Sequence, residues 1–141
     1  MTTFTVDEIQ SMLDKSPFIK ALQMQAVAWA PDETPQRLVL RMPMTDLAER
    51  QAGARQMHGG PIASLIDTAG CFAVGLALGG RGLPTIAFST NYLRPVVDTT
   101  ATATALVRRI GKSVGIADVD VVNDDGVLVA IGRTEYSTRQ G

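Results

Sequence analysis

The chain has 141 residues, of which 45% are hydrophobic, and its formal net charge is −1. This length predicts one domain with a sizeable hydrophobic core, and the balanced charge argues against a nucleic acid or a membrane surface as the main partner. One cysteine, Cys71, excludes an internal disulfide and suits a reducing compartment, so we expect a cytoplasmic protein. With one cysteine and one histidine in the chain, we expect no metal site.

The N-terminal part predicts a short helix and two strands. Thr5 and Glu8 have the spacing of a capping box, which predicts a helix over about 5–16. Residues 21–30 predict a first strand, and the alternation of apolar and polar side chains over 37–42 predicts a second. The first residues carry neither the basic nor the apolar region of a secretory signal, so we expect none.

The most informative segment begins at His58. Gly59 and Gly60 lead into an apolar helix predicted over about 60–79, and Asp67, about two turns inside it, is its only charged residue. A carboxylate is costly to desolvate, so we expect Asp67 to be neutral, tied into hydrogen bonds, or kept there for chemistry. The helix is short for a bilayer and carries this carboxylate, so we expect a buried core helix.

After this helix, three or four strand patterns predict an antiparallel meander, with a hairpin turn at Asn123 to Gly126 before the last strand. The order of elements predicts an α+β fold, a single domain over 1–141 whose antiparallel sheet wraps around one central helix. Because one helix cannot cover both faces of a sheet of about five strands, we expect subunits to pair. The strand patterns cover residues 85–93, 99–109, 113–122 and 127–137.

Three features together resemble one known family: His58-Gly59-Gly60, Asp67 nine residues after the histidine, and Tyr92-Leu93-Arg94-Pro95. The chain resembles the hotdog-fold acyl-CoA thioesterases, most closely the phenylacetic-acid-degradation type of the 4-hydroxybenzoyl-CoA thioesterase superfamily, over about residues 30–137. The resemblance implies a homodimer, commonly paired into a tetramer, with active sites at the subunit interface. It also implies hydrolysis of an acyl-CoA thioester without a cofactor, since CoA is part of the substrate.

The resemblance implies a role for four residues. Asp67 corresponds to the family's acidic residue on the central helix, and the backbone N–H of Gly59 corresponds to its oxyanion donor. His58 corresponds to the motif histidine, to which we assign a positioning role rather than that of a general base. The hydroxyl that often holds the attacking water falls on Thr85.

The loop before the histidine departs from the family pattern. Family members usually have Asn or Gln six residues before the histidine and Gly three residues before it, whereas this chain has Ala52 and Arg55. Gln51 and Gly53 fill these roles if the loop contains a one-residue insertion. We therefore expect Gln51 to contact the thioester carbonyl.

Elementary chemistry supports this reading of the helix. The first turn of a helix offers unpaired N–H groups and a partial positive charge, which stabilise a developing oxyanion. Asp67 can activate a water or attack the carbonyl to give a mixed anhydride, and the sequence leaves both routes open. Since Gly59 and Asp67 lie roughly 12–13 Å apart along one helix, we expect two subunits to share each site.

A small basic cluster lies in the predicted hairpin after residue 107. Arg108, Arg109 and Lys112 surround Gly111, and Ser113 follows. The cluster is either a solvated turn or the contact for the phosphates of CoA.

Two other functions stay open at this stage. One is a hydratase or dehydratase of acyl thioesters, which usually needs an acid/base pair that a lone carboxylate does not supply. The other is a non-catalytic module that binds acyl-CoA, and the lack of a helix-turn-helix pattern in the first 60 residues counts against a regulator.

Overall fold

The computed structural model describes residues 3–140, so Met1, Thr2 and Gly141 of the predicted domain lie outside the described residues. A long helix follows two short helices and two strands, and four further strands complete the chain. The strand Thr85–Tyr92 pairs with the strand Leu128–Ser137 and not with the next strand along the chain, so the predicted meander is right for the last three strands and wrong for the first. The elements are α1 (Val6–Leu13), α2 (Pro17–Ala21), β1 (Gln25–Ala30), β2 (Arg37–Met42), the 3₁₀ turn η1 (Asp46–Ala48), α3 (Gly59–Ala77), β3 (Thr85–Tyr92), β4 (Ala101–Ile110), β5 (Val114–Val122) and β6 (Leu128–Ser137).

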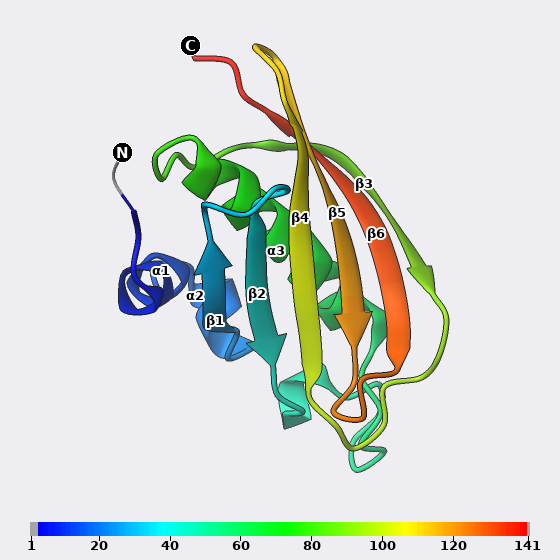
Figure 1. Ribbon diagram of the computed structural model, residues 1–141. Helices are drawn as coiled ribbons and strands as arrows, with labels where there is room; N and C mark the ends of the chain where they lie inside the picture. Colours follow the sequence, from blue (N-terminus) through cyan, green and yellow to red (C-terminus); the bar gives the residue numbers. More distant parts are fainter. Residues whose placement is uncertain (1–2, 141) are drawn as a thin grey trace.

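The strands form one antiparallel sheet of six, in the order β1-β2-β4-β5-β6-β3. Figure 1 shows the sheet curving around α3, with the two short helices beside β1. This is the hotdog fold, with one strand more than the sheet of about five that the sequence suggested. In β4 the alanines at 101, 103 and 105 are fully buried and the threonines between them are not, as a period of two requires. The edges of the sheet are β1 and β3.

The N-terminal helix is shorter than the sequence predicted. Its capping box is confirmed, since Thr5 Oγ1 accepts from the Glu8 N–H at 3.1 Å and Glu8 Oε2 accepts from the Thr5 N–H at 2.9 Å. The helix ends at Leu13, however, and not near residue 16. The reason is local: Ser16 caps a second helix, and Pro17 occupies its first position, where a missing N–H costs nothing.

The central helix starts one residue earlier than predicted, with His58 as its N-cap, and ends at Ala77. Gly79 and Gly80 follow with φ of 84° and 92°, a left-handed conformation that glycine adopts without strain. By length and composition α3 could cross a bilayer, but nine of its residues are buried and it lies along the concave face of the sheet (Figure 1).

Glycines allow α3 to lie close to the sheet. A Cβ on Gly70 would lie 2.6 Å from Tyr136 Oη of β6, and one on Gly132 would lie 2.7 Å from Ile66 Cγ2 of the helix. Real carbon atoms do not approach this closely, so the helix and β6 fit together only with glycine at both places. This close packing determines where α3 presents Asp67.

Candidate active site

Asp67 and Thr85 lie together between α3 and the start of β3. Thr85 Oγ1 donates a hydrogen bond to Asp67 Oδ1 at 2.9 Å. The Asp67 side chain is half-buried and Thr85 is exposed, so the pair lies at the surface of this chain rather than in its core. A carboxylate held by a hydroxyl at the edge of an apolar helix can orient a water molecule or a reacting carbonyl. The structure thus brings together two of the site residues that the sequence predicted.

Tyr136 holds the backbone at the same place, and sequence reasoning missed it. Tyr136 Oη donates to the carbonyl oxygen of Asp67 at 2.7 Å from a fully buried position on β6. Burial raises the pKa of Tyr136, so its hydroxyl stays protonated and remains a donor. The alternation in 127–137 indicates that this side chain points toward the helix, but it does not reveal the partner.

The N-terminus of α3 presents an available backbone donor. His58 Nδ1 accepts from the Gly60 N–H at 3.1 Å, which makes the exposed histidine a helix cap. The Gly59 N–H has no acceptor within residues 3–140, as the first turn of a helix predicts. Tyr92 Oη donates to the Gly59 carbonyl at 2.6 Å. A Cβ on Gly59 would lie 3.1 Å from Tyr92 Oη, so the tyrosine packs closely against this glycine.

A cavity of about 360 Å³ opens beside this end of α3. The loop before the helix and the end of β3 form its walls, and two arginines, Arg50 and Arg94, give it positive charge. Gln56 belongs to the wall as well. The complete lining is Arg50, Gln56, Met57, Gly59, Ile62, Tyr92, Leu93, Arg94, Pro95 and Val96.

Gln51 lies on an exposed turn and does not line this cavity, whereas Gln56 does. Arg55, three residues before His58, has φ of 54°, the left-handed conformation in which glycine is favoured. Gly53, the glycine of the proposed one-residue insertion, has φ of 80° as well, so the backbone conformation does not distinguish the two alignments of the loop. The carbonyl contact proposed for Gln51 stays a prediction, and Gln56 is the glutamine beside Gly59.

The predicted basic cluster is divided in the structure. Arg108 Nε donates to Asp118 at 2.8 Å, and Arg133 Nε donates to the same carboxylate at 2.7 Å. The hydrogen bond from Arg133, helped by that from Arg108, holds the pKa of Asp118 below its ordinary value. Asp118 alternates with the buried residues of β5, so this ion-pair group lies on the face of the sheet opposite α3.

The rest of the cluster lies at the end of β4 and in the turn between β4 and β5. Arg109 and Lys112 are exposed there. Gly111 accepts at its carbonyl from Thr138 Oγ1 at 2.6 Å, which ties the turn to the residues after β6. Ser113 Oγ accepts from Arg139 at 3.3 Å in the same region. Across residues 3–140, no group of three or more His, Cys, Asp or Glu side chains is arranged to hold a metal ion.

Comparisons with known proteins identify the family of this chain. The chain matches the thioesterase superfamily over residues 56–130. A Halobacterium salinarum protein assigned as an esterase is 33% identical over 150 aligned positions, covering 96% of each chain. The acyl-coenzyme A thioesterase PaaI of Escherichia coli is 38% identical over 93 residues, which are 64% of each chain. The solved structure of the E. coli PaaI protein, from the phenylacetic acid degradation operon, superposes with a TM-score of 0.78 at 29% identity, covering 96% of this chain and 92% of the other. The chain therefore belongs to the thioesterase superfamily.

Proposed function

We propose that this protein hydrolyses acyl-CoA thioesters to a free acid and CoA. One observation carries the proposal: the only carboxylate on α3 is half-buried and bonded at 2.9 Å to the hydroxyl of Thr85. Membership of the thioesterase superfamily supports thioester hydrolysis, and similarity to a protein named as an acyl-coenzyme A thioesterase supports CoA as the carrier. We further propose that the reaction needs no metal or redox cofactor and takes place in the cytoplasm.

In the proposed reaction Asp67 acts on a water bound beside the pair, at the carboxylate oxygen Oδ2 that Thr85 does not occupy. The carboxylate takes a proton as the water oxygen attacks the thioester carbonyl carbon, and the C–S bond then breaks. The CoA sulfur leaves with that proton, and the acyl group leaves as the acid. Direct attack by Asp67, with a mixed anhydride that water then hydrolyses, is the second route. In this route water attacks the carboxyl carbon of Asp67, so the bridging Asp67 oxygen leaves with the acyl group and the ¹⁸O of labelled water stays on Asp67. An unlabelled product acid after a single turnover in H₂¹⁸O therefore identifies direct attack.

As the water attacks, negative charge develops on the thioester carbonyl oxygen. We assign the stabilisation of this oxyanion to the Gly59 N–H of a second subunit. Asp67 lies eight residues after Gly59, or about 12 Å along the axis, too far for both to reach one carbonyl carbon and its oxygen. A helix N-terminus in the partner subunit supplies the donor that Asp67 lacks in its own chain.

The free edge of the sheet supports such a dimer. β3 pairs on one side only, with β6, and it exposes the apolar side chains of Ile86 and Phe88. If two copies of β3 pair antiparallel about a two-fold axis at the middle of the strand, Thr85 of one copy faces Tyr92 of the other. Thr85 is bonded to Asp67 and Tyr92 to Gly59. Each dimer, alone or paired into a tetramer, then contains two complete sites.

We assign the phosphates of CoA to the exposed turn at Arg109 and Lys112, with Gly111 and Ser113 shaping it. Arg108 is the weaker candidate, because its guanidinium is already bonded to Asp118. Arg109→Ala and Lys112→Ala should raise KM for CoA esters and leave KM for N-acetylcysteamine thioesters, which lack phosphates, unchanged. If neither variant changes KM for CoA esters, the turn is a solvated surface.

Thiol release from a panel of acyl-CoAs tests the function as a whole, with hydration of crotonyl-CoA as the parallel assay. We expect thiol release, and a fall in kcat of about 10²-fold or more in Asp67→Asn. Hydration without thiol release would identify a hydratase instead. Tight binding of acyl-CoA with neither reaction would identify a binding module.

A further inference from the structure

Strand β3 is bonded to α3 at both of its ends. Its first residue, Thr85, donates to the Asp67 carboxylate, and its last residue, Tyr92, donates to the Gly59 carbonyl at 2.6 Å. The proposed reaction uses the bond from Thr85, but it assigns no task to the bond from Tyr92. Tyr92 is 52% exposed, so the rule that buried polar groups need partners does not account for this bond.

The peptide group that carries the Gly59 N–H lies between two anchored peptide groups. On one side, the His58 N–H donates to the Ala48 carbonyl at 2.8 Å. On the other side is the peptide group that joins Gly59 to Gly60. Its carbonyl accepts from Tyr92, and its N–H donates to His58 Nδ1 at 3.1 Å. Two successive glycines have much conformational freedom, so these anchors decide where the Gly59 N–H points.

The backbone that follows Tyr92 is fixed as well. The N–H groups of Leu93 and Arg94 both donate to the Val129 carbonyl, at 2.8 and 3.1 Å. Arg94 Nη1 donates in addition to the Leu128 carbonyl at 2.6 Å. The first residues of β6 thus hold the end of β3 in place, and Tyr92 connects this part of the sheet to the first turn of α3.

We propose that Tyr92 is a positioning residue, which holds the first turn of α3 so that the Gly59 N–H is directed at the thioester carbonyl. This inference rests on the proposed function, in which Gly59 stabilises the oxyanion. A phenol has one O–H proton, and Tyr92 uses it on the Gly59 carbonyl, so the tyrosine acts through the backbone and is not itself an oxyanion donor. A donor that is fixed in advance needs no reorganisation as charge develops on the carbonyl oxygen.

Tyr92→Phe is the first test, because it keeps the ring and removes the bond to Gly59. Outright loss of one oxyanion donor costs about 10²- to 10³-fold in kcat. In this variant the donor is present but no longer held, so we expect kcat to fall by about tenfold while KM changes by less than about twofold. Sedimentation at the assay concentration checks that the variant has the same oligomeric state as the wild type.

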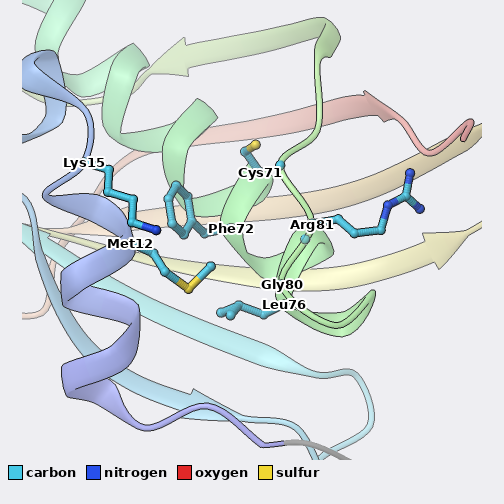
Figure 2. Close-up of a pocket in the computed structure, with 9 residues that line it drawn as sticks. Met12, Lys15, Cys71, Phe72, Leu76, Gly80 and Arg81 are labelled. Atoms are coloured by element: carbon cyan, nitrogen blue, oxygen red, sulfur yellow. The ribbon is translucent and has the colours of Figure 1, made fainter. Parts of the chain in front are cut away.

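Cys71→Ala is the matched control. Cys71 Sγ donates to the Leu83 carbonyl at 3.4 Å, so this side chain also joins α3 to the backbone near β3 by one hydrogen bond. It lies in the C-terminal half of α3, in the wall of a separate cavity of about 200 Å³ (Figure 2). The distance from Gly59 is about 18 Å along the helix axis. We therefore expect Cys71→Ala to change neither kcat nor KM.

Binding of the carbonyl provides a readout that does not depend on hydrolysis. In acetyl-dethia-CoA a methylene replaces the thioester sulfur, so this ketone cannot be hydrolysed but keeps its carbonyl at the thioester position. S-ethyl-CoA has the same length and no carbonyl. We expect the wild type to bind the ketone about 3- to 10-fold more tightly, the contribution of one hydrogen bond. Tyr92→Phe should bind the two compounds with Kd values within about twofold of each other, as measured by isothermal titration calorimetry.

The outcomes separate the role of Tyr92 from the proposed function. If no ester is hydrolysed but Tyr92→Phe abolishes the preference for the ketone, the proposed reaction is wrong and the role of Tyr92 holds. If esters are hydrolysed and Tyr92→Phe changes neither kcat nor this preference, only the role of Tyr92 is wrong. Three other results would show a merely structural tyrosine and overturn the inference: a fall in kcat with an unchanged preference, an equal fall in Cys71→Ala, or a Tyr92→Phe protein that no longer pairs.

Discussion

Replacing Thr85 and Asp67 singly and together tests whether they act as one unit. Thr85→Val keeps the shape of the side chain and removes the hydroxyl that donates to Asp67 at 2.9 Å. A hydrogen bond to a charged group contributes about 1.5–3 kcal/mol. Because Thr85 is exposed, we take the lower end of this range, which corresponds to a loss of about tenfold in kcat. Asp67→Asn removes the charge and should cost about 10²-fold or more.

If Thr85 acts only through the carboxylate, the double variant should be no slower than Asp67→Asn alone. Thiol release under saturating substrate measures kcat for all four proteins. Thr90→Val is the matched control, because Thr90 is the other threonine of β3 and its buried hydroxyl has no partner. It should leave kcat unchanged and raise or preserve the melting temperature. Losses that multiply fully in the double variant, or an Asp67→Asn enzyme within a few-fold of wild type, would refute the reasoning.

Three further outcomes are expected. If Gln56 supplies the carbonyl contact beside Gly59, Gln56→Ala should lower kcat by about 10-fold or more. If the loop contains the one-residue insertion, Gln51→Ala should cause that loss instead. The variant with the larger loss in kcat identifies the donor. Phe88→Glu puts charge on the exposed edge strand, so sedimentation should show an inactive monomer; an active monomer would exclude a shared site. Asp118→Asn should lower the urea midpoint at pH 7. Since the folded pKa of Asp118 lies below 3.8, the advantage of the wild type is complete above pH 3.8 and shrinks as the pH falls through the folded pKa; a difference in midpoint that grows as the pH falls below 3.8 would contradict the assignment.

Patterns among residues close in the sequence were enough to predict most of the helices and strands around the site. The capping box at Thr5 is a contact between residues three apart, and the alternation of alanine and threonine in β4 is a property of a pleated strand, so both can be read without knowing the fold. Asp67 stood out for the same kind of reason, since one charge in an apolar helix needs an explanation. What these rules misjudged are boundaries: Ser16 caps a new helix just where the first was expected to continue.

The parts of the site that the sequence did not reveal depend on contacts between distant segments. Tyr136 bonds the Asp67 carbonyl across 69 positions of sequence, and Tyr92 bonds the Gly59 carbonyl across 33. The periodicity of the sequence does not predict these partners, because packing determines how α3 is placed on the sheet. Here the close contacts at Gly70 and Gly132 determine that placement. The two tyrosines fix the two ends of the same helix segment, one at the carboxylate and one at the oxyanion donor. The helix is therefore held by hydrogen bonds at both of these places, and the distance of about 12 Å between them along the helix axis is the reason that the proposed reaction needs a second subunit at each site.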